Sequence, residues 1–455
     1  MFKNVLKIAI PVSVENILSN TGIFLMTLML TKLGEVPVAV NGIAGQASFL
    51  VILFLFGLNS GGGIFLAQFW GKKDYDGISK TTGLMLVSSL LISTVFFVLT
   101  FFFPTFFASI FSKDQLVITS SAEFLRIISL SYFAISLEVV FRTFLRSIER
   151  AVIPMESYIF GTMLQVGLAY LLTFGHFGFP KLGYVGIAWA TLVGRYFIPA
   201  YQLLRITLSD LKISLFNFAI PRSFLKRFLN YAAPTTLNEI AWSLGMTVYG
   251  IVFGRMGTKV YAARNVLSSF ENYVWTFTFG LVIASAVLVG KMIGEMHYSE
   301  ALSFAKKMLK VNVLIGTLSA GLIILVYYFL LPGFKLEYET KRMLTLAMWV
   351  MFVGAPIKAF NGTAIVGVLR AGGDAKFAFL LESSTLWLIG VPLAYIGAFV
   401  WNLDMPLVYA LTLSDELVKS IVAYFRIKSN KWIRNVTLEE PVIVNEALRS
   451  VEHEL

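Results

Sequence analysis

The chain contains no cysteine and little charge. The absence of cysteine from its 455 residues excludes a disulfide framework, a thiolate metal site and a cysteine nucleophile. Only 14% of the residues are charged, well below the roughly 25% of soluble domains. The three histidines cannot supply a zinc-protease motif or a histidine-based triad, and the phosphate-binding G-x-x-x-x-G-K-[ST] loop is absent.

Apolar side chains dominate what is present. Hydrophobic residues make up 57% of the chain, with 41 phenylalanines, so these side chains require lipid around them and predict a multi-pass membrane protein. In such a chain, the net charge of +11 is expected to set topology rather than to bind a polyanion. We therefore expect the lipid bilayer as a partner and no nucleic acid.

Apolar runs long enough to cross a membrane occur twelve times, at about 20 residues per crossing. The predicted spans are 8–31, 43–69, 82–104, 121–143, 154–175, 184–206, 230–254, 260–289, 310–331, 343–368, 377–399 and 405–425. The acidic stretch beyond them predicts a water-exposed tail. The connections between consecutive spans can be numbered from the N-terminus. Most lysines and arginines outside the spans fall in the even-numbered connections, as in Lys72-Lys73 and Lys306-Lys307, and at the two ends of the chain. This bias predicts cytoplasmic termini in a cell membrane protein.

The two halves of the sequence resemble each other. Identical residues recur 223 positions apart without a gap: Pro11 and Pro234, Gly22 and Gly245, Gly34 and Gly257, Gly57 and Gly280, Gly71 and Gly294. Leu145-Arg146 matches Leu369-Arg370 at an offset of 224. We expect an all-α fold of two parallel six-helix repeats: a lobe at 1–206, a cytoplasmic linker at 207–228, a second lobe at 229–427 and a cytoplasmic tail at 428–455. Two such lobes are typical of secondary transporters.

A set of ordered motifs makes the resemblance specific. It comprises Ala9-Ile10-Pro11, Leu33-Gly34, the stretch from Gly57 through Gln68 to Gly71, Gly183 to Thr191, Leu369 to Asp374, and Trp387 to Tyr395. Together they resemble the MATE multidrug and toxic compound extrusion family of the MOP superfamily, over about residues 10–425. The resemblance implies a V-shaped two-lobe antiporter without catalytic residues or fixed metal. It would export amphiphilic, mostly cationic compounds in exchange for Na⁺ or H⁺.

Three acidic positions of the family are missing. The first-helix aspartate falls on Met26, the seventh-helix glutamate on Trp242 and the tenth-helix aspartate on Ala359. Since an intramembrane charge is a functional hypothesis by default, the remaining polar residues of the spans become candidates. As ion-coupling candidates we take Glu239, Glu271, Asn265, Asn361 and Lys358, and as substrate-cleft candidates Asn20, Met26, Trp242 and Arg264. A buried glutamate–lysine or glutamate–arginine pair that only holds helices together is the alternative.

Other polar positions favour structural roles. Glu15 predicts a snorkelling or water-facing side chain near the cytoplasmic end, and Glu138 with Arg142 predicts a local ion pair. Asp415 and Glu416 predict contact with water or headgroups in a peripheral last span. The Gly57-x-x-x-Gly61 motif predicts close helix packing.

Two other functions stay open. A lipid-linked oligosaccharide or glycolipid flippase of the same superfamily would use intramembrane cations such as Lys358, Arg264 and Arg195 to bind phosphate. An intramembrane enzyme would need a nucleophile and a base, and no such pairing stands out. Monomeric transport of small amphiphiles without a cofactor is the leading hypothesis.

The charge bias predicts which side of the membrane each loop faces. Since the chain has no native cysteine, Lys73→Cys and Lys307→Cys should react with an impermeant maleimide only from the cytoplasm. Lys113→Cys should react only from outside. Labelling of the Lys73→Cys variant in intact cells would show that the orientation is reversed.

Overall fold

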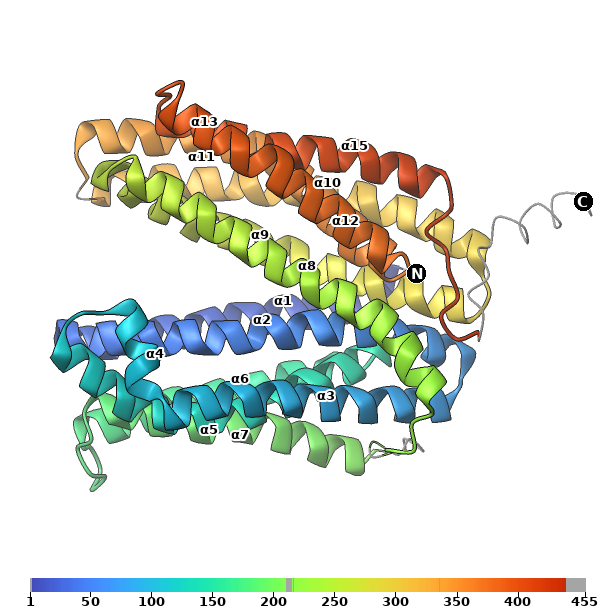
Figure 1. Ribbon diagram of the computed structural model, residues 1–455, viewed down its shortest axis with the longest axis horizontal. Coiled ribbons are helices and arrows are strands. Elements are labelled where there is room, and N and C mark those ends of the chain that lie inside the picture. The colour runs from blue at the N-terminus through green and yellow to red at the C-terminus, as the bar shows by residue number, and fades with distance from the viewer. Residues whose placement is uncertain (1, 210–214, 216, 335, 439–455) are drawn as a thin grey trace, which may run out of the picture. The chain divides into compact units, whose positions relative to one another are not determined.

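A computed structural model describes residues 2–209, 215, 217–334 and 336–438, and these residues form a helical protein (Figure 1). The first seven helices are α1 (Phe2–Thr31), α2 (Glu35–Lys72), α3 (Tyr75–Phe102), α4 (Pro104–Phe111), α5 (Gln115–Ser147), α6 (Val152–Phe174) and α7 (Tyr184–Thr207). They are followed by α8 (Arg222–Arg255), α9 (Thr258–Gly294), α10 (Tyr298–Leu330), η1 (Leu331–Gly333), α11 (Tyr338–Gly362), η2 (Thr363–Arg370), α12 (Ala375–Thr385), η3 (Leu386–Gly390), α13 (Val391–Phe399), α14 (Met405–Leu411) and α15 (Ser414–Lys428).

The multi-span helical fold is confirmed. Each predicted span coincides with one helix or with consecutive helical segments, and in the described residues nine helices have the length and composition to cross a membrane. The last span consists of the short helices α14 and α15. Two spans contain π-helical segments, η2 after α11 and η3 between α12 and α13. Such segments occur often at functional sites because they shift the register of the side chains.

The helices group into two compact units. Unit 1 comprises residues 1–9, 67–74 and 237–455, and unit 2 comprises residues 10–66 and 75–236. Helices α1, α2 and α8 therefore each contribute to both units. The boundaries of the two lobes and of the linker stay predictions. Residues 210–214 and 216 of the predicted linker lie outside the described residues.

Unit 2 packs α5 between α3 and α7, with α6 along α7. Its apolar core surrounds the fully buried ring of Tyr132. The predicted close packing at Gly57 and Gly61 is confirmed: a β-carbon at either glycine would lie 2.5 Å from a backbone Cα of α8, at Thr236 or Ala232. The hydroxyl of Thr235 in α8 donates to the carbonyl of Gly57 in α2 at 2.7 Å, which holds the two helices together where they cross.

Unit 1 packs α9, α10 and α11 side by side, with α14 and α15 against α11. Its apolar core includes Phe270 and Tyr327, whose rings meet edge to face at 5.7 Å. Gly354 allows Leu413 to approach α11 closely. This packing places the polar side chains of α9, α11 and α15 inside one unit.

Most residues of the predicted tail between 432 and 437 are buried in unit 1, so the water-exposed prediction is wrong for them. Trp432 is fully buried against Gly372, where a β-carbon would clash with its ring. The buried amide of Gln68 donates to the Arg434 carbonyl at 3.2 Å and accepts from the Val436 amide at 2.8 Å. The apolar residues Trp432, Ile433 and Val436 of the tail are buried in the core. The acidic residues from 439 onward lie outside the described residues.

Burial of Trp432 predicts a large effect of its truncation. Removing a fully buried tryptophan side chain costs about 3 to 5 kcal/mol, so Trp432→Ala should lower the melting temperature of the purified protein by several degrees. Trp401→Ala is the matched control because Trp401 is 53% exposed. Equal melting temperatures for the two variants, measured by scanning fluorimetry, would contradict the docked tail.

Candidate functional site

Glu271 of α9 lies at the centre of the first polar cluster. Its two carboxylate oxygens accept from Arg264 Nη1 and from Lys358 Nζ, each at 2.7 Å. The Tyr409 hydroxyl also donates to it at 2.7 Å. One carboxylate thus neutralises two cations, so this cluster carries a net positive charge. Three of the predicted candidates, Glu271, Lys358 and Arg264, meet here, in the ion-pair arrangement that was the structural alternative.

The second cluster is formed by α15 and α11. Lys419, whose side chain is 3% exposed, lies 2.9 Å from Glu416 and 3.4 Å from Asp415. The Asn361 side-chain amide donates to the Glu416 carboxylate at 2.5 Å and accepts from the Ser420 hydroxyl at 2.8 Å. Asp415 is only 2% exposed, so the predicted contact with water or headgroups is wrong. The i, i+3, i+4 spacing of Asp415, Glu416 and Lys419 was the signal in the sequence, because it places them on one helical face.

The third cluster joins α8, η2 and α12. Arg370 Nη1 lies 2.8 Å from Glu239, and Arg370 Nη2 lies 3.3 Å from Glu382. The Asn238 amide donates to Glu382 at 2.7 Å. The side chains of Arg370, Glu239 and Glu382 are 3%, 12% and 16% exposed. Two half-buried carboxylates therefore share one guanidinium group, which leaves this cluster with a net negative charge.

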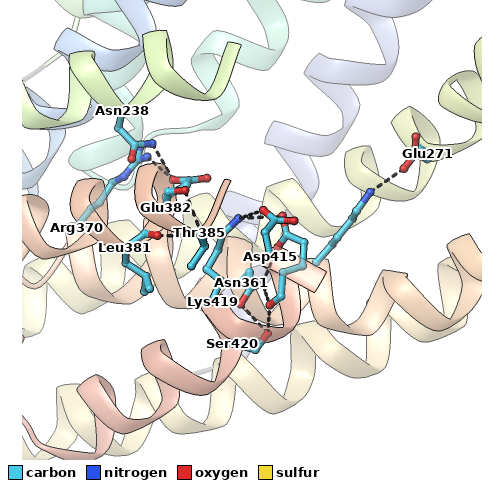
Figure 2. Close-up of polar contacts among 12 residues, drawn as sticks. Asn238, Glu271, Asn361, Arg370, Leu381, Glu382, Thr385, Asp415, Lys419 and Ser420 are labelled. Carbon is cyan, nitrogen blue, oxygen red and sulfur yellow. Dashed lines mark hydrogen bonds and ion pairs between the residues drawn. The ribbon is translucent and has the colours of Figure 1, made fainter. Parts of the chain in front are cut away.

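The three clusters form a polar track through unit 1, shown in Figure 2 from Asn238 to Glu271. The acidic members are Glu239, Glu271, Glu382, Asp415 and Glu416, and the basic members are Arg264, Lys358, Arg370 and Lys419. Lys358 also acts electrostatically on Asp415 and Glu416, which balances the first two clusters against each other. The unbalanced carboxylate therefore belongs to the third cluster.

Unit 2 contains a counterpart of the third cluster. Arg146 lies 2.7 Å from Glu15, whose side chain is 2% exposed and also lies 3.7 Å from Arg142. The predicted Glu138–Arg142 pair is confirmed at 3.2 Å. A water-facing Glu15 is wrong, because the two arginines hold it inside the unit.

The two ion pairs lie at nearly equivalent places in the internal repeat: in the register of Pro11 and Gly22 the counterpart of Glu15 is Asn238, and Glu239 follows it directly. Glu15 and Glu239 are 224 positions apart, as are Arg146 and Arg370. At the same offset Tyr158 of unit 2 corresponds to Glu382 of unit 1, and the Tyr158 hydroxyl donates to Glu138 at 3.1 Å. The repeat thus conserves the ion pair, and unit 1 adds a carboxylate where unit 2 has a phenol.

The remaining cleft candidates, and the ion-coupling candidate Asn265, lie outside these clusters. Met26 is partly buried, and its sulfur accepts from the Gln165 amide at 3.2 Å. Asn20, Asn265 and Trp242 are exposed. Their roles at a cleft or an ion site stay predictions.

Comparison with known proteins identifies the family. The MatE family model matches residues 11–171 and 234–396, one stretch in each half of the chain. The chain belongs to the MATE family. It is therefore a multi-pass membrane transporter rather than an enzyme, as the resemblance predicted.

Individual MATE proteins match over most of the chain. The probable multidrug resistance protein YoeA of Bacillus subtilis (strain 168) is 25% identical, over 87% of each chain. An outward-facing multidrug resistance MATE transporter of the MOP superfamily superposes with a TM-score of 0.84 at 18% identity, over 94% of this chain and 96% of that one. A MATE structure in complex with MaL6 gives the same TM-score at 19% identity, with the same coverage.

The repeat-related pair Glu15–Arg146 predicts a specific stability pattern. Glu15→Gln should lower the melting temperature strongly, because removing one partner of a buried pair costs about 3 to 5 kcal/mol. The double variant Glu15→Gln/Arg146→Met should recover much of that loss, since Arg142 keeps Glu138 as its partner. A double variant as unstable as the sum of the single variants would show that the two side chains act independently.

Proposed function

We propose that this MATE protein is a secondary active antiporter that exports amphiphilic compounds in exchange for Na⁺ or H⁺, with the coupling ion bound between Glu239 and Glu382. The observation that carries this proposal is the sharing of one buried guanidinium group, that of Arg370, by two half-buried carboxylates. The mostly cationic substrates implied by the family resemblance remain part of the proposal.

A coupling site must bind its ion in one state and release it in another. Two carboxylates near one cation meet this need, because their mutual repulsion favours uptake of a proton or a metal cation by one of them. Na⁺ prefers a shell of hard oxygen atoms, as Ca²⁺ and Mg²⁺ do, and the two carboxylates and the Asn238 side-chain oxygen supply such atoms. That amide oxygen is buried and has no hydrogen-bond partner in the described part of the chain.

The other clusters are less suitable for a coupling cation. Glu271 already faces Arg264 and Lys358, both at 2.7 Å, so an added cation would be repelled by two charges. Asp415 and Glu416 share Lys419, and the positive charge of Lys358 also acts on both carboxylates, so an added cation would be repelled there as well. We therefore place Glu271 and Lys358 as supports of helices α9 and α11, and Glu239 and Glu382 as the coupling pair.

Transport in proteoliposomes tests the proposal. Efflux of a fluorescent amphiphile should depend on an opposing Na⁺ or H⁺ gradient, and Glu239→Gln and Glu382→Gln should each reduce this dependence at least tenfold. Asp404→Asn is the control, because Asp404 is an exposed carboxylate of the same unit.

Glu271→Gln separates the proposal from its main alternative. This variant should keep the ion dependence even where its stability falls. Loss of ion dependence in Glu271→Gln, with normal coupling in Glu239→Gln and Glu382→Gln, would move the ion site to the first cluster. Gradient-independent efflux by the unaltered protein would refute antiport.

A further inference from the structure

Unit 1 contains a groove that the proposed coupling site does not use. The groove runs along α11 between α10 and α15 and has a volume of about 550 Å³. It is lined by Pro356, Ile357 and Phe360 of α11, by Val313 of α10 and by residues of α15 between 420 and 425. All three helices belong to predicted membrane spans, so the groove offers space for a hydrocarbon chain within the bilayer.

The lining of the groove is almost wholly apolar. Ser420 donates its hydroxyl to the side-chain oxygen of Asn361 and to the Glu416 carbonyl, each at 2.8 Å, and so directs it into the second cluster. Ile421 and Phe425 expose most of their side chains. Lipid tails are as apolar as these side chains, so the surface suits an acyl chain better than a polar solute.

The end of α15 and the start of α10 lie at the same end of unit 1. The Asn435 side chain, which follows α15, donates to the Ile293 carbonyl near the end of α9 at 3.3 Å. Helix α10 begins shortly afterwards, at Tyr298. The charge bias of the sequence predicts that this end faces the cytoplasm.

Exposed lysines continue the groove toward that end. On α10, Lys306 and Lys310 come two turns and one turn before Val313, and on α15 Lys428 comes one turn after Tyr424. Each lysine therefore lies on the helical face that lines the groove. All three are exposed, and none forms an ion pair or hydrogen bond with another residue in the described ranges. Their positive charges are thus available to a ligand.

The lysines on the two sides lie at similar distances beyond the groove. Asn312 and Ser420 both donate to residues of α11 within 359–361, at 3.3 and 2.8 Å, so the two sides of the groove meet α11 at one level. At a rise of 1.5 Å per residue, Lys306 lies about 9 Å along α10 from Asn312, and Lys428 about 12 Å along α15 from Ser420. Long lysine side chains reach from such positions to the headgroup region.

We infer that the groove binds an anionic phospholipid of the bilayer, with an acyl chain along α11 and the phosphate near Lys310 and Lys428. The apolar lining holds the chain, and the lysines select the charge of the headgroup. Each basic residue near a membrane surface contributes about fivefold to the affinity for anionic lipid. The inference concerns the lipid-facing side of unit 1 and does not depend on the proposed antiport.

Lipid binding to the purified full-length protein, measured by native mass spectrometry from a neutral detergent, tests the site. The probes are dioleoylphosphatidylglycerol and dioleoylphosphatidylcholine, which have the same acyl chains and differ in net charge. The unaltered protein should bind the phosphatidylglycerol at least tenfold more tightly. Lys310→Gln/Lys428→Gln should remove most of that preference, and Val313→Trp should weaken binding of both lipids at least threefold because it fills the groove.

Two matched controls lie in the same unit. Arg255→Gln/Arg342→Gln removes two exposed charges at the opposite ends of the spans, and Leu318→Trp adds a tryptophan to an exposed position of α10 outside the groove. Both should bind lipid like the unaltered protein. Melting temperatures without lipid should be the same for the lysine variant and the unaltered protein, since the lysines are exposed.

Three results would overturn the inference. The first is equal affinity for the two lipids, or a preference for phosphatidylglycerol that survives in Lys310→Gln/Lys428→Gln. The second is tighter binding of dodecylammonium than of phosphatidylglycerol, lost in Val313→Trp, which would assign the groove to a cationic amphiphile. The third is a dimer that Val313→Trp converts to a monomer, which would assign the groove to a second copy of the chain.

Discussion

The high cost of an unpaired charge inside a membrane governs the polar interior of this protein. Burying an ion away from water is tolerated only where another charge and several hydrogen bonds compensate it. Glu15, Glu239, Glu271 and Asp415 each meet this condition through an arginine or lysine on the same or a neighbouring helix. Because the pairs of Glu15, Glu239 and Glu271 join helices that are distant in sequence, they fix the packing within each unit. The few groups left without full compensation then stand out as sites where an ion or a ligand can bind.

The internal repeat shows which part of this arrangement is common and which is particular to one half. The Glu15–Arg146 and Glu239–Arg370 pairs recur at 2.7 and 2.8 Å, as expected of a contact that holds the helices of both halves. The halves then diverge at one position. Unit 1 has the carboxylate of Glu382 where unit 2 has the phenol of Tyr158, whereas Arg195 of unit 2 corresponds to another cation, Lys419. The proposed cation site in unit 1 follows from this added carboxylate.

The sequence alone predicted the family, the helical fold and most of the spans, because apolar runs and recurring glycines depend only on local composition and register. It also predicted the pairing of Glu271 with Lys358 or Arg264 as one of two alternatives. The Glu239–Arg370 pair was missed because Glu239 lies one residue beyond the counterpart of Glu15 and because the contact joins helices 131 residues apart in the sequence. The buried Asp415 and Trp432 were missed because their burial depends on segments far away in the chain. Hydrophobic periodicity carries no information about such contacts.

Direct measurement of ion binding tests the central claim that Glu239 and Glu382 hold the coupling ion. Na⁺ is added to the purified protein in weak buffer. We expect either saturable Na⁺ binding, measured by calorimetry, or the release of protons that Na⁺ displaces from the same site. Glu382→Tyr, which gives unit 1 the residue that unit 2 has at Tyr158, should abolish that signal while retaining the Glu239–Arg370 pair and the fold. An unchanged signal in Glu382→Tyr, with a normal melting temperature, would contradict the account.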